Sequence, residues 1–413
     1  MKILLVTETI PGPQLGGLGK HVVALGNSLI EQGHEVVLMG RARPSYESCA
    51  DEIGFNGQFI AGFDDPFKGW KERLFGAFVP GKRRWYSRKI ALGILSRSKG
   101  FDVVHYHGLH PMVGRFIPTT VPFVQTRHDQ SSDCVIYTRF KNGDVCASLN
   151  VFDCASCASR HPTLPQRLLS GFAVWEYRVG VRAALGRHFT IFVSNFLKEN
   201  CFRSLGGFDK KNVFVIHNSI DRDLFDLSFK RRRIFCKAET PVTTTIHVAA
   251  RLDPSKGVGV LLRTLVPRLP PGWKVNVFGD GPERMGLVES FSSEQVVFHG
   301  HSKNSVVIEA AVKSQVAIVP SVWEEPFGVA TLEVLRLGLP CYALNRGGTP
   351  ELSAYANSGQ LKLFENIESL VDALVAETNF ECFEELPDSL NDWIGEILGV
   401  YEKMLLEKVM NDQ

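Results

Sequence analysis

Short apolar runs alternate with amphipathic segments of helical length along most of this chain. The runs span three or four residues each and are rich in Val, Ile, Leu and Phe, as is typical of strands buried in a parallel sheet. We expect strands in the first half of the chain at Ile3–Val6, Val36–Met39, Val103–Tyr106, Phe123–Gln125 and Ile191–Val193. In the second half we expect them at Ile246–Ala249, Val275–Phe278, Val296–Phe298, Ala317–Val319 and Cys341–Leu344. The alternation predicts two α/β units, each built on a parallel sheet.

Helical patterns fall between these runs and at the end of the chain. Lys20–Gln32 and Val258–Leu265 are predicted helices, and Gly33 suits the end of the first one. Within Asp392–Val409 the apolar residues recur at helical spacing, namely Trp393, Ile394, Ile397, Leu398, Tyr401, Met404 and Leu405. The sequence therefore predicts an amphipathic terminal helix.

A break in the pattern separates the two units. Asn218–Glu239 has poor periodicity and a run of four basic residues that begins at Lys230, and both features are typical of a linker. A chain of 413 residues is also too long for one compact core. We therefore expect one domain at residues 1–217, a second at 218–391, and a terminal helix at 392–413.

The composition is that of an ordinary soluble protein, with 44% apolar residues, 22% charged residues and a net charge of +2. No apolar run approaches the ~20 residues that span a bilayer, and the apolar start of the chain is too short for a signal peptide. The nine cysteines are an odd number, and five of them are scattered singly, which does not suit a secreted disulfide framework (Cys49, Cys201, Cys236, Cys341 and Cys382). We expect a cytoplasmic protein.

Two carboxylates follow the predicted strand Ala317–Val319 in the pattern Glu-Pro-Phe-Gly-Val-Ala-Thr-Leu-Glu, from Glu325 to Glu333. Glu333 lies inside a largely apolar helical segment, where an ionised carboxylate needs partners, and ligand hydroxyls are suitable ones. Phe327 and Gly328 bring backbone N–H groups to the start of that helix, which favours an anion. Glu333 would lie roughly 7 Å along the helix from that anion site. The spacing suits a sugar nucleotide, with the sugar at the loop, the diphosphate at the helix start and the ribose further along.

Two cations follow the predicted strand Ile246–Ala249. Arg251 and Lys256 would lie at the carboxyl end of that strand, where two positive charges suit a diphosphate leaving group. They would neutralise the charge that develops on the leaving phosphate. A solvated turn is the alternative. Glycine-containing turns at 279–282 and 299–301 follow other strands on the same side of the sheet, where α/β proteins bind ligands.

A glycine cluster, Gly-Gly-Leu-Gly at residues 16–19, lies between the first strand and the first helix. Its N–H groups could cradle a phosphate, although a plain tight turn fits the same residues. The cluster does not match the dinucleotide pattern G-x-G-x-x-G. The second strand also ends in Gly40-Arg41, without an acid for a ribose hydroxyl. A nicotinamide enzyme is therefore disfavoured.

One histidine stands out in the first half of the chain. His128 follows the predicted strand Phe123–Gln125, and a histidine at a strand end could orient or polarise a reacting hydroxyl or phosphate. Many such histidines only satisfy local hydrogen bonds, so both interpretations stay open at this point.

Four cysteines occur in one polar stretch at about residues 130–160 with the spacing C-x11-C-x7-C-x2-C, namely Cys134, Cys146, Cys154 and Cys157. The C-x2-C end is typical of a structural zinc site, and four thiolates would explain how so polar a loop folds. A redox or disulfide role and unrelated loop cysteines are the alternatives. A zinc ion with four protein ligands would be structural, because no coordination position stays open for catalysis.

Basic and aromatic residues are interleaved in Pro66–Lys99, which contains ten Lys or Arg and one acid, Glu72. Phe67, Trp70 and Trp85 are among its aromatic residues. The pattern favours a segment that lies on an anionic membrane surface. A solvated basic helix or a nucleic-acid patch is the alternative, and we expect no nucleic-acid partner.

Taken together, these motifs resemble those of the family-four retaining glycosyltransferases of the GT-B fold. The likeness covers almost the whole chain in the family's order, and the two-glutamate motif with the Arg/Lys pair is its specific part. The motifs that carry it are Gly16-Gly17-Leu18-Gly19, Asn218-Ser219-Ile220-Asp221, Arg251…Lys256-Gly257, Gly279-Asp280-Gly281-Pro282, Glu325-Pro-Phe-Gly…Glu333 and Gly347-Gly348-Thr349-Pro350-Glu351.

The resemblance implies two Rossmann-like domains with parallel sheets that face each other across a cleft. By this likeness Arg251 and Lys256 would bind the diphosphate and Glu333 the ribose hydroxyls of the donor, without a catalytic metal. The transferred sugar would be addressed by Glu325, Phe327 and Gly328. Gly17 would close over the diphosphate from the first domain, and His128 would lie near the point of transfer. The terminal helix at 392–413 would cross back to the first domain.

Two residues depart from the family pattern. The linker motif usually reads Asn-Gly-Ile-Asp, and Ser219 takes the place of the glycine. Ala250 precedes Arg251 where a glycine is common, which puts in doubt how closely the backbone approaches the phosphate there. The cysteine stretch after His128 resembles an insertion found in a subset of the family.

The sequence as a whole predicts an enzyme that transfers a hexose-type unit, with retention, from a nucleoside diphosphate sugar to an acceptor hydroxyl. The basic aromatic segment points to a lipid-linked or cell-envelope glycan as acceptor, and so to the inner face of the cytoplasmic membrane. A sugar-nucleotide 2-epimerase on the same fold and a non-catalytic sugar-nucleotide-binding protein are the alternatives. The sequence does not disclose the base, the sugar, the linkage or the oligomeric state.

Overall fold

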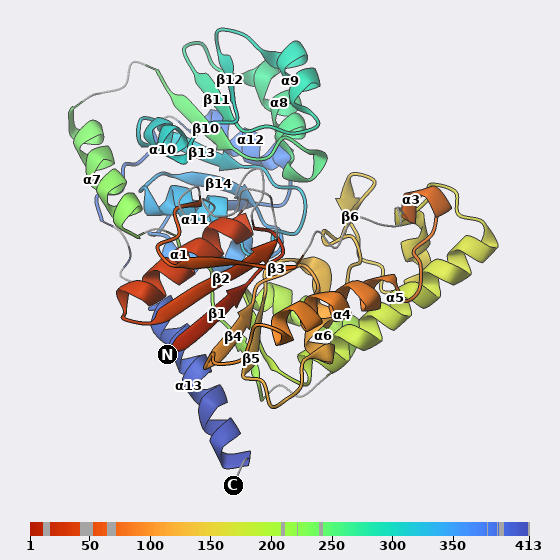
Figure 1. The fold of residues 1–413 in the computed structure, drawn as a ribbon. Helices are drawn as coiled ribbons and strands as arrows, with labels where there is room; N and C mark the ends of the chain where they lie inside the picture. Colours follow the sequence, from red (N-terminus) through yellow and green to blue (C-terminus); the bar gives the residue numbers. More distant parts are fainter. Residues whose placement is uncertain are drawn as a thin grey trace. The chain divides into compact units, whose positions relative to one another are not determined.

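The structure is a computed structural model that describes residues 1–10, 17–41, 53–63, 72–207, 211–220, 222–238, 243–377, 379–385, 387 and 392–411. The chain forms two compact units. The first consists of Met1–Arg139, Ala147–Asn218 and Asp392–Gln413, and the second of Phe140–Cys146 and Ser219–Asn391. Each unit is an α/β structure around its own parallel sheet (Figure 1).

The first unit contains a seven-stranded parallel sheet in the order β3-β2-β1-β4-β5-β8-β9. Strand β1 is buried along nearly its whole length because helices cover both faces of the sheet. The strands are β1 (Lys2–Val6), β2 (Glu35–Arg41), β3 (Gln58–Phe63), β4 (Val103–Tyr106), β5 (Phe123–Arg127), β8 (Phe189–Phe192) and β9 (Val213–Val215).

The helices of the first unit follow its strands in alternation. The long helix α5 runs along one edge of the unit, beside α4 (Figure 1). The helices are α1 (Gly17–Glu31), α3 (Glu72–Phe75), α4 (Lys82–Leu95), α5 (Leu164–Leu185), α6 (Asn195–Leu205) and α13 (Trp393–Asn411), with the 3₁₀ segments η2 (Pro111–Phe116), η3 (Gln130–Ser132) and η4 (Val151–Cys157).

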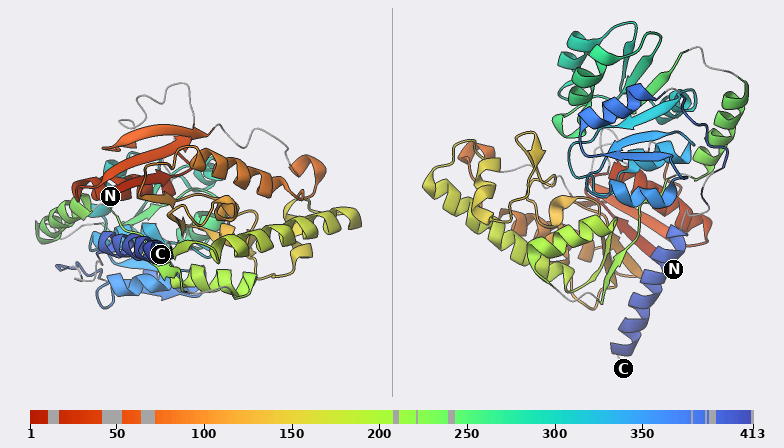
Figure 2. Two further views of the ribbon diagram at one scale, coloured as in Figure 1. Left: turned by 60° about the horizontal axis from the view of Figure 1, so that its bottom comes forward. Right: turned by 180° about the vertical axis from the view of Figure 1, so that it is seen from behind.

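The terminal helix α13 packs into the core of the first unit. Trp393, Ile397 and Tyr401 belong to the same buried cluster as Ile3 and Leu25. Figure 2 shows this dark blue helix beside the strands near the N-terminus. Its apolar stripe therefore explains why the chain returns to the first unit after the second is complete.

The second unit contains a six-stranded parallel sheet in the order β12-β11-β10-β13-β14-β15. Its strands are β10 (Thr245–Ala249), β11 (Lys274–Phe278), β12 (Val296–Gly300), β13 (Val316–Val319), β14 (Cys341–Leu344) and β15 (Leu361–Phe364). Its helices are α7 (Arg222–Ala238), α8 (Val258–Leu265), α9 (Arg284–Phe291), α10 (Asn304–Val312), α11 (Val329–Arg336) and α12 (Ile367–Ala376), with the 3₁₀ segments η5 (Pro254–Lys256), η6 (Val266–Arg268) and η7 (Thr349–Tyr355).

The ten predicted strands all coincide with or overlap observed ones, and Val258–Leu265 matches α8. Strands β3, β9 and β15 were not predicted. They lie at sheet edges, where one side is partly solvated and the apolar signal is weaker. The cysteine stretch adds a two-stranded antiparallel ladder, β6 (Phe140–Lys141) with β7 (Asp144–Val145).

The linker expected at Asn218–Glu239 is wrong, because residues 222–238 form helix α7. Phe225 and Phe229 are buried in it, and so is Arg232 from the basic run. The Arg232 guanidinium donates hydrogen bonds to the carbonyl oxygens of Val312 (2.9 Å), the last residue of α10, and of Gly338 (3.3 Å), which follows α11. A buried cation at two helix ends stabilises them, so the basic run serves packing.

Candidate active site

The predicted donor residues lie at the carboxyl edge of the second sheet. Arg251 follows β10, Lys256 ends η5, and Glu325 lies in the loop between β13 and α11. Parallel strands end at the same edge, so loops from different strands meet there. The structure thereby brings together side chains that are far apart in the sequence.

Lys256 and Glu325 form a direct ion pair at this edge. The Lys256 Nζ atom lies 2.6 Å from Glu325 Oε1, and Ser321 Oγ donates to the same oxygen at 2.7 Å. The ammonium group also lies 4.5 Å from the centre of the Trp323 ring. Both partners are mostly buried, with side chains 23% and 13% exposed. The pair therefore has a defined position before any ligand binds.

The environment keeps Glu325 ionised. Burial raises the pKa of this carboxyl, whereas the charge of Lys256 and the hydrogen bonds from Lys256 and Ser321 lower it. The lowering effects are together the larger, so the pKa lies below its ordinary value of 4.5. At neutral pH the site holds a carboxylate beside an ammonium ion. A sugar hydroxyl can bind the carboxylate while a phosphate binds the ammonium.

Two glycines allow the loop around Glu325 to fit against its neighbours. Gly257 has a φ of +69°, and a Cβ atom there would lie 2.1 Å from the carbonyl oxygen of Pro320. Gly347 has a φ of +60°, and a Cβ atom there would lie 2.3 Å from the carbonyl oxygen of Glu325. That oxygen accepts a hydrogen bond from the Gly348 N–H at 2.7 Å. Any other residue at 257 or 347 would displace the loop.

Helix α11 begins where the sequence predicts the anion site. Gly328 caps it with a φ of +97°, and the Phe327 side chain before it is buried. The first N–H groups of a helix have no partners within it, so they can donate to an anion. In this arrangement Phe327 anchors the loop through packing, while the backbone N–H groups at the start of α11 can donate to a ligand.

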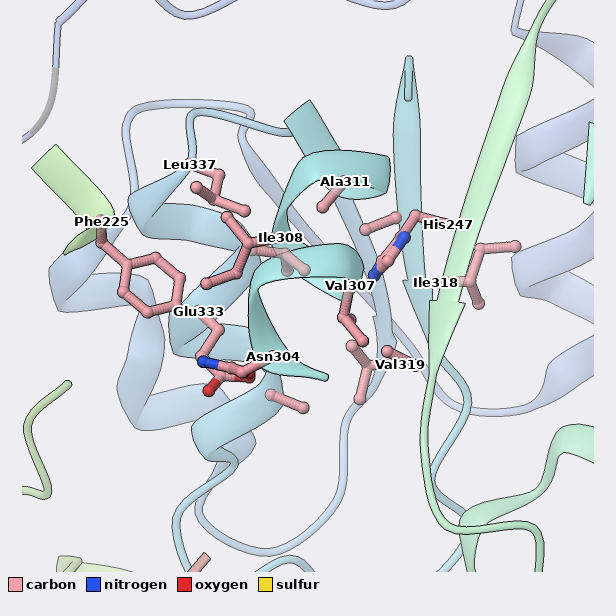
Figure 3. Close-up of a pocket in the computed structure, with 14 residues that line it drawn as sticks. Phe225, His247, Asn304, Val307, Ile308, Ala311, Ile318, Val319, Glu333 and Leu337 are labelled. Atoms are coloured by element: carbon pink, nitrogen blue, oxygen red, sulfur yellow. The ribbon is translucent and has the colours of Figure 1, made fainter. Parts of the chain in front are cut away.

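Glu333 lines a small cavity of about 30 Å³ in the second unit. Figure 3 shows its carboxylate among the mostly apolar side chains of Phe225, Val307, Ile308 and Leu337, with Asn304 and His247 as further polar groups. The cavity also touches Ala249 and Val319 at the carboxyl ends of β10 and β13. A carboxylate here is positioned for ligand hydroxyls at the same sheet edge as the ion pair.

Arg251 differs from its predicted partner Lys256. Its side chain is 71% exposed, and its Nε atom lies 3.5 Å from Asp253 Oδ2. Asp253 is itself fixed, since it caps η5 through a 3.0 Å bond from the Ser255 N–H. The structure thus holds Lys256 in place and leaves the guanidinium of Arg251 largely exposed at the protein surface.

The first unit gathers three histidines where the sequence singled out one. His128 follows β5, His107 follows β4 and His21 lies on α1, and one ring nitrogen from each lies within 4.8 Å of the others. His107 Nδ1 and His128 Nε2 are 3.0 Å apart, which is hydrogen-bond distance. Among the described residues, this is the group that could hold a metal ion.

These imidazoles are neutral at physiological pH. Burial, with smaller contributions from neighbouring positive groups, lowers the pKa of His128 and of His107 well below 6.5, and burial lowers that of His21 to about 4. Within the described part of the chain, His21 Nδ1 and His107 Nε2 are buried without hydrogen-bond partners. Neutral rings with unmatched nitrogens suit hydrogen bonding to a ligand better than proton donation as cations.

A buried polar network lies next to the histidines and was missed in the sequence. Glu8 follows β1, and its Oε1 accepts a hydrogen bond from the Tyr106 hydroxyl at 3.0 Å. Burial raises the pKa of Glu8, although hydrogen bonds and the charge of Arg127 oppose this shift. Glu8 Oε2 and the Nε and Nη1 atoms of Arg127 have no partner among the described residues. The only sequence signal was a charged residue near the carboxyl end of each buried strand.

The glycine cluster is described in part. Gly16 lies outside the described residues, and Gly17 begins helix α1. A Cβ atom on Gly17 would meet nothing within 4 Å, so packing inside the unit does not require a glycine there. Close approach of a ligand would be a reason for it.

Comparison with known proteins shows the family of this chain. The Glycosyltransferase Family 4 model matches residues 15–224, just over half of the chain, and the Glycosyl transferases group 1 model matches residues 243–377. The chain belongs to glycosyltransferase family 4. The resemblance inferred from its motifs is thereby confirmed.

Two curated relatives of this glycosyltransferase extend over most of its length. Glycogen synthase of Mycobacterium tuberculosis is 26% identical over 393 residues, which cover 87% of this chain and 81% of the relative. An uncharacterized glycosyltransferase of Methanocaldococcus jannaschii is 26% identical over 401 residues, covering 92% and 90%.

Solved structures share the fold of this glycosyltransferase. The catalytic domain of starch synthase IV from Arabidopsis thaliana, bound to ADP and acarbose, aligns with a TM-score of 0.64 at 14% identity over 98% of this chain and 99% of that one. Anabaena HepE in complex with UDP and glucose aligns with a TM-score of 0.57 at 14% identity over 100% and 98%. The expected GT-B fold is confirmed.

The cysteine stretch of this glycosyltransferase is held by a buried ion pair. Arg139 Nη1 contacts Asp133 Oδ2, and it also donates to Ser204 Oγ on α6 at 2.9 Å. Arg178 on α5 donates to the carbonyl oxygens of Asp133 and Leu149. Cys134, Cys146, Cys154 and Cys157 are each partly buried. Zinc binding by these four residues stays a prediction.

Two of the five cysteines interpreted as single residues are joined. Cys236 at the end of α7 forms a disulfide with Cys382. Their sequence separation of 146 residues hid this pairing from sequence reasoning, which has no signal for contacts at that separation.

The basic aromatic segment Pro66–Lys99 is described from residue 72 onward, so Phe67 and Trp70 lie outside the described residues. The part in view forms α3 and α4, with Trp85 exposed. Among the helices that the structure describes, none is long and apolar enough to span a membrane.

Proposed function

We propose that this protein transfers a hexose-type unit, with retention of configuration, from a nucleoside diphosphate sugar to an acceptor hydroxyl. The observation that carries the proposal is the buried Lys256–Glu325 pair beside the start of α11. It combines a cation for a leaving phosphate with a carboxylate for sugar hydroxyls. Membership of glycosyltransferase family 4 supports the same assignment.

In this proposal the residues have separate roles on the donor. Lys256 and Arg251 bind the diphosphate, and Glu333 accepts hydrogen bonds from the ribose hydroxyls. Glu325, Phe327 and Gly328 position the transferred sugar. From the first unit, Gly17 approaches the diphosphate, and neutral His128 hydrogen-bonds the sugar near the reacting carbon.

The proposed reaction takes place on one face of the sugar. The bond between C1 and the diphosphate oxygen breaks as the acceptor oxygen forms its bond to C1 from the same side. The departing phosphate oxygen takes up the acceptor's proton, and Lys256 with Arg251 stabilises the charge that develops on it. Two side-chain cations and a helix N-terminus supply this stabilisation, so the proposal assigns no catalytic metal.

We place the acceptor among lipid-linked or cell-envelope glycans, and the enzyme at the cytoplasmic face of the membrane. Support comes from the basic and aromatic segment at residues 66–99. Relatives point the same way in part: a phosphatidylinositol N-acetylglucosaminyltransferase subunit of Schizosaccharomyces pombe is 26% identical over 404 residues. The fold is shared with WaaG, a glycosyltransferase involved in lipopolysaccharide biosynthesis, at a TM-score of 0.58.

We also propose that Cys134, Cys146, Cys154 and Cys157 bind one structural zinc ion. The structure does not hold these four sulfur atoms within reach of one ion, so zinc would have to draw together a stretch that is otherwise held by the Arg139–Asp133 pair. Elemental analysis of purified protein should give about one zinc per chain, and replacement of Cys154 and Cys157 by serine should abolish it. Metal-free wild-type protein that stays fully folded would contradict the proposal.

The functional test is a nucleotide-release assay with UDP-, GDP- and dTDP-sugars, with and without an acceptor mixture. The proposal predicts nucleoside diphosphate release that depends on acceptor. Conversion of donor in the absence of acceptor would instead identify a 2-epimerase. Donor binding without turnover in any mixture would identify a non-catalytic sugar-nucleotide-binding protein.

A further inference from the structure

Helix α5 presents a continuous apolar face to solvent. Leu164, Leu168, Phe172, Trp175 and Val179, here called the α5 face, are each between 44% and 69% exposed. Their spacing of four, four, three and four residues places them on one side of the helix. The face is roughly 22 Å long. Large apolar side chains gathered in this way on a surface mark an interaction site.

The first unit holds the α5 face rigidly. Val174, Tyr177 and Val181 on the opposite side of α5 are buried, and the Tyr177 hydroxyl donates to the carbonyl oxygen of Ser131. Phe172 and Trp175 stack on each other with ring centres 5.5 Å apart. The exposed side chains therefore sit on a fixed support, so their binding to a partner requires little ordering of the backbone.

Helix α3 extends the apolar surface at the start of α5. Gln166 Nε2 donates to the carbonyl oxygen of Phe75 at 3.0 Å, which fixes α3 beside the first turn of α5. Leu74 and Phe75 are both exposed. Figure 1 shows α3 next to the α5 end that is farthest from the sheet.

The charges on α5 are almost all positive. Arg167 and Arg182 are exposed on one long edge of the α5 face, and Arg178 lies on the same edge but donates to the carbonyl oxygens of Asp133 and Leu149. Glu176 is the one acid on the helix, and its Oε2 accepts a hydrogen bond from the Gly81 N–H at 2.6 Å. The exposed surface of α5 therefore offers apolar groups and arginines without a competing carboxylate.

We propose that the α5 face lies flat on an anionic lipid bilayer, with its apolar side chains among the acyl chains and its arginines at the headgroups. Trp and Phe beside a cationic edge suit the boundary between headgroups and acyl chains. A second copy of this chain would bring another positively charged surface, which disfavours self-association through this face. The inference rests on the membrane contact proposed above for residues 66–99, and it assigns the main docking element to a different helix.

The exposed end of α13 provides an internal comparison. Leu406 and Met410 are exposed there to a similar or greater degree. They alternate with charges of both signs, since Glu402, Lys403, Glu407 and Lys408 lie on the same helix. Such a surface lacks the charge selection that an anionic bilayer requires, so we expect no lipid binding from it.

Vesicle flotation tests the assignment with the full-length protein. The wild type should float with vesicles that contain phosphatidylglycerol and remain unbound with pure phosphatidylcholine. Phe172→Ser with Trp175→Ser should lower the partition coefficient about tenfold or more. Arg167→Gln with Arg182→Gln should lower it about tenfold and weaken its dependence on salt. Leu406→Ser with Met410→Ser is the matched control and should bind as the wild type does.

Donor-induced thermal stabilisation, measured on every variant, separates the possible failures. All variants should keep the wild-type shift, because α5 is not part of the donor site. If the wild type floats with anionic vesicles and the Phe172/Trp175 variant floats equally well, the role of α5 is overturned, but membrane contact itself is not. A wild type that ignores anionic vesicles, or an oligomer that the Phe172/Trp175 variant dissociates, would overturn the bilayer as the partner. If the donor does not raise the melting temperature of the wild type, the proposed transferase function is contradicted instead.

Discussion

Single residues in this protein are held ready for a ligand by groups that the sequence places far away. Glu325 is fixed by Lys256, 69 residues earlier in the chain, and by Ser321 from its own loop. His128 is joined by His107 and His21 from two other elements. The sequence identified Glu325, Lys256 and His128 from their positions at strand ends. It could not identify His21 or His107, because a single histidine gives no indication of which others it will meet.

Glu333 provides the sharpest test of donor binding at this scale. Glu333→Ala should raise the dissociation constant for the donor on the order of tenfold to a hundredfold, because ribose hydroxyls lose a charged acceptor. Isothermal titration with the best donor measures this. Glu289→Ala, an exposed glutamate on α9, is the control. Equal affinities of Glu333→Ala and wild type would remove the ribose role.

The buried histidines should make stability depend on pH. Burial lowers the pKa of His105 to about 3, from an ordinary value of 6.5. Above pH 6.5 both the folded and the unfolded states are neutral, so the stability contribution is complete. As the pH falls below 6.5 the unfolded state binds a proton that the folded state rejects, and stability is lost until the folded pKa is reached.

Each such histidine should reduce the free energy of unfolding by about 1.4 kcal/mol per pH unit below its unfolded pKa. His105→Gln should therefore give a shallower loss between about pH 6 and pH 5, since the glutamine does not titrate. Urea unfolding of the first unit across this range measures the slope. Parallel curves for variant and wild type would mean that the pKa of His105 is the same in the folded and unfolded states.

At the scale of elements, apolar periodicity was sufficient for most of the fold. The central strands are buried on both faces, so their sequences read as unbroken apolar runs, and all of them were predicted. Edge strands β3 and β15 were missed because partial exposure removes that signal. Helix α7 was mistaken for a linker because its stability comes from Arg232 and two phenylalanines that bind distant segments. Tertiary contacts of this kind are invisible to local patterns.

The disulfide at the end of α7 gives a prediction at this scale. Cys236 and Cys382 should resist alkylation in unreduced protein and react after reduction. Reduction, or Cys236→Ser with Cys382→Ser, should lower the stability of the second unit by about 2–4 kcal/mol, because a long loop is no longer closed in the unfolded chain. Alkylation of both thiols without reductant would show that the bond is absent. Disulfides are rare in reducing compartments.

At the scale of the whole molecule, the chain combines two α/β units, each with its own core and its own group of polar side chains near the carboxyl ends of its strands. The second unit holds the ion pair, the start of α11 and Glu333 along one sheet edge. The first unit holds neutral histidines and the Glu8–Arg127 network. In the proposed function, residues of the second unit bind the leaving group and His128 of the first unit hydrogen-bonds the reacting sugar.

Removing both proposed phosphate ligands tests this division. Arg251→Ala with Lys256→Ala should reduce turnover on the order of 100-fold or more, because the leaving phosphate loses its positive partners. Since Lys256 also holds Glu325, the single variant Arg251→Ala separates the loss of charge from disruption of the loop. Nucleotide release under saturating donor measures both variants, and normal turnover in the double variant would remove the leaving-group role.

The most direct measurement is an experimental structure of the protein with an intact nucleoside diphosphate sugar. We predict that the terminal phosphate lies within hydrogen-bond distance of Lys256 Nζ and of the first N–H groups of α11. The ribose hydroxyls should donate hydrogen bonds to Glu333. A donor bound elsewhere, with Lys256 still paired to Glu325 alone and the start of α11 in contact with solvent, would contradict it.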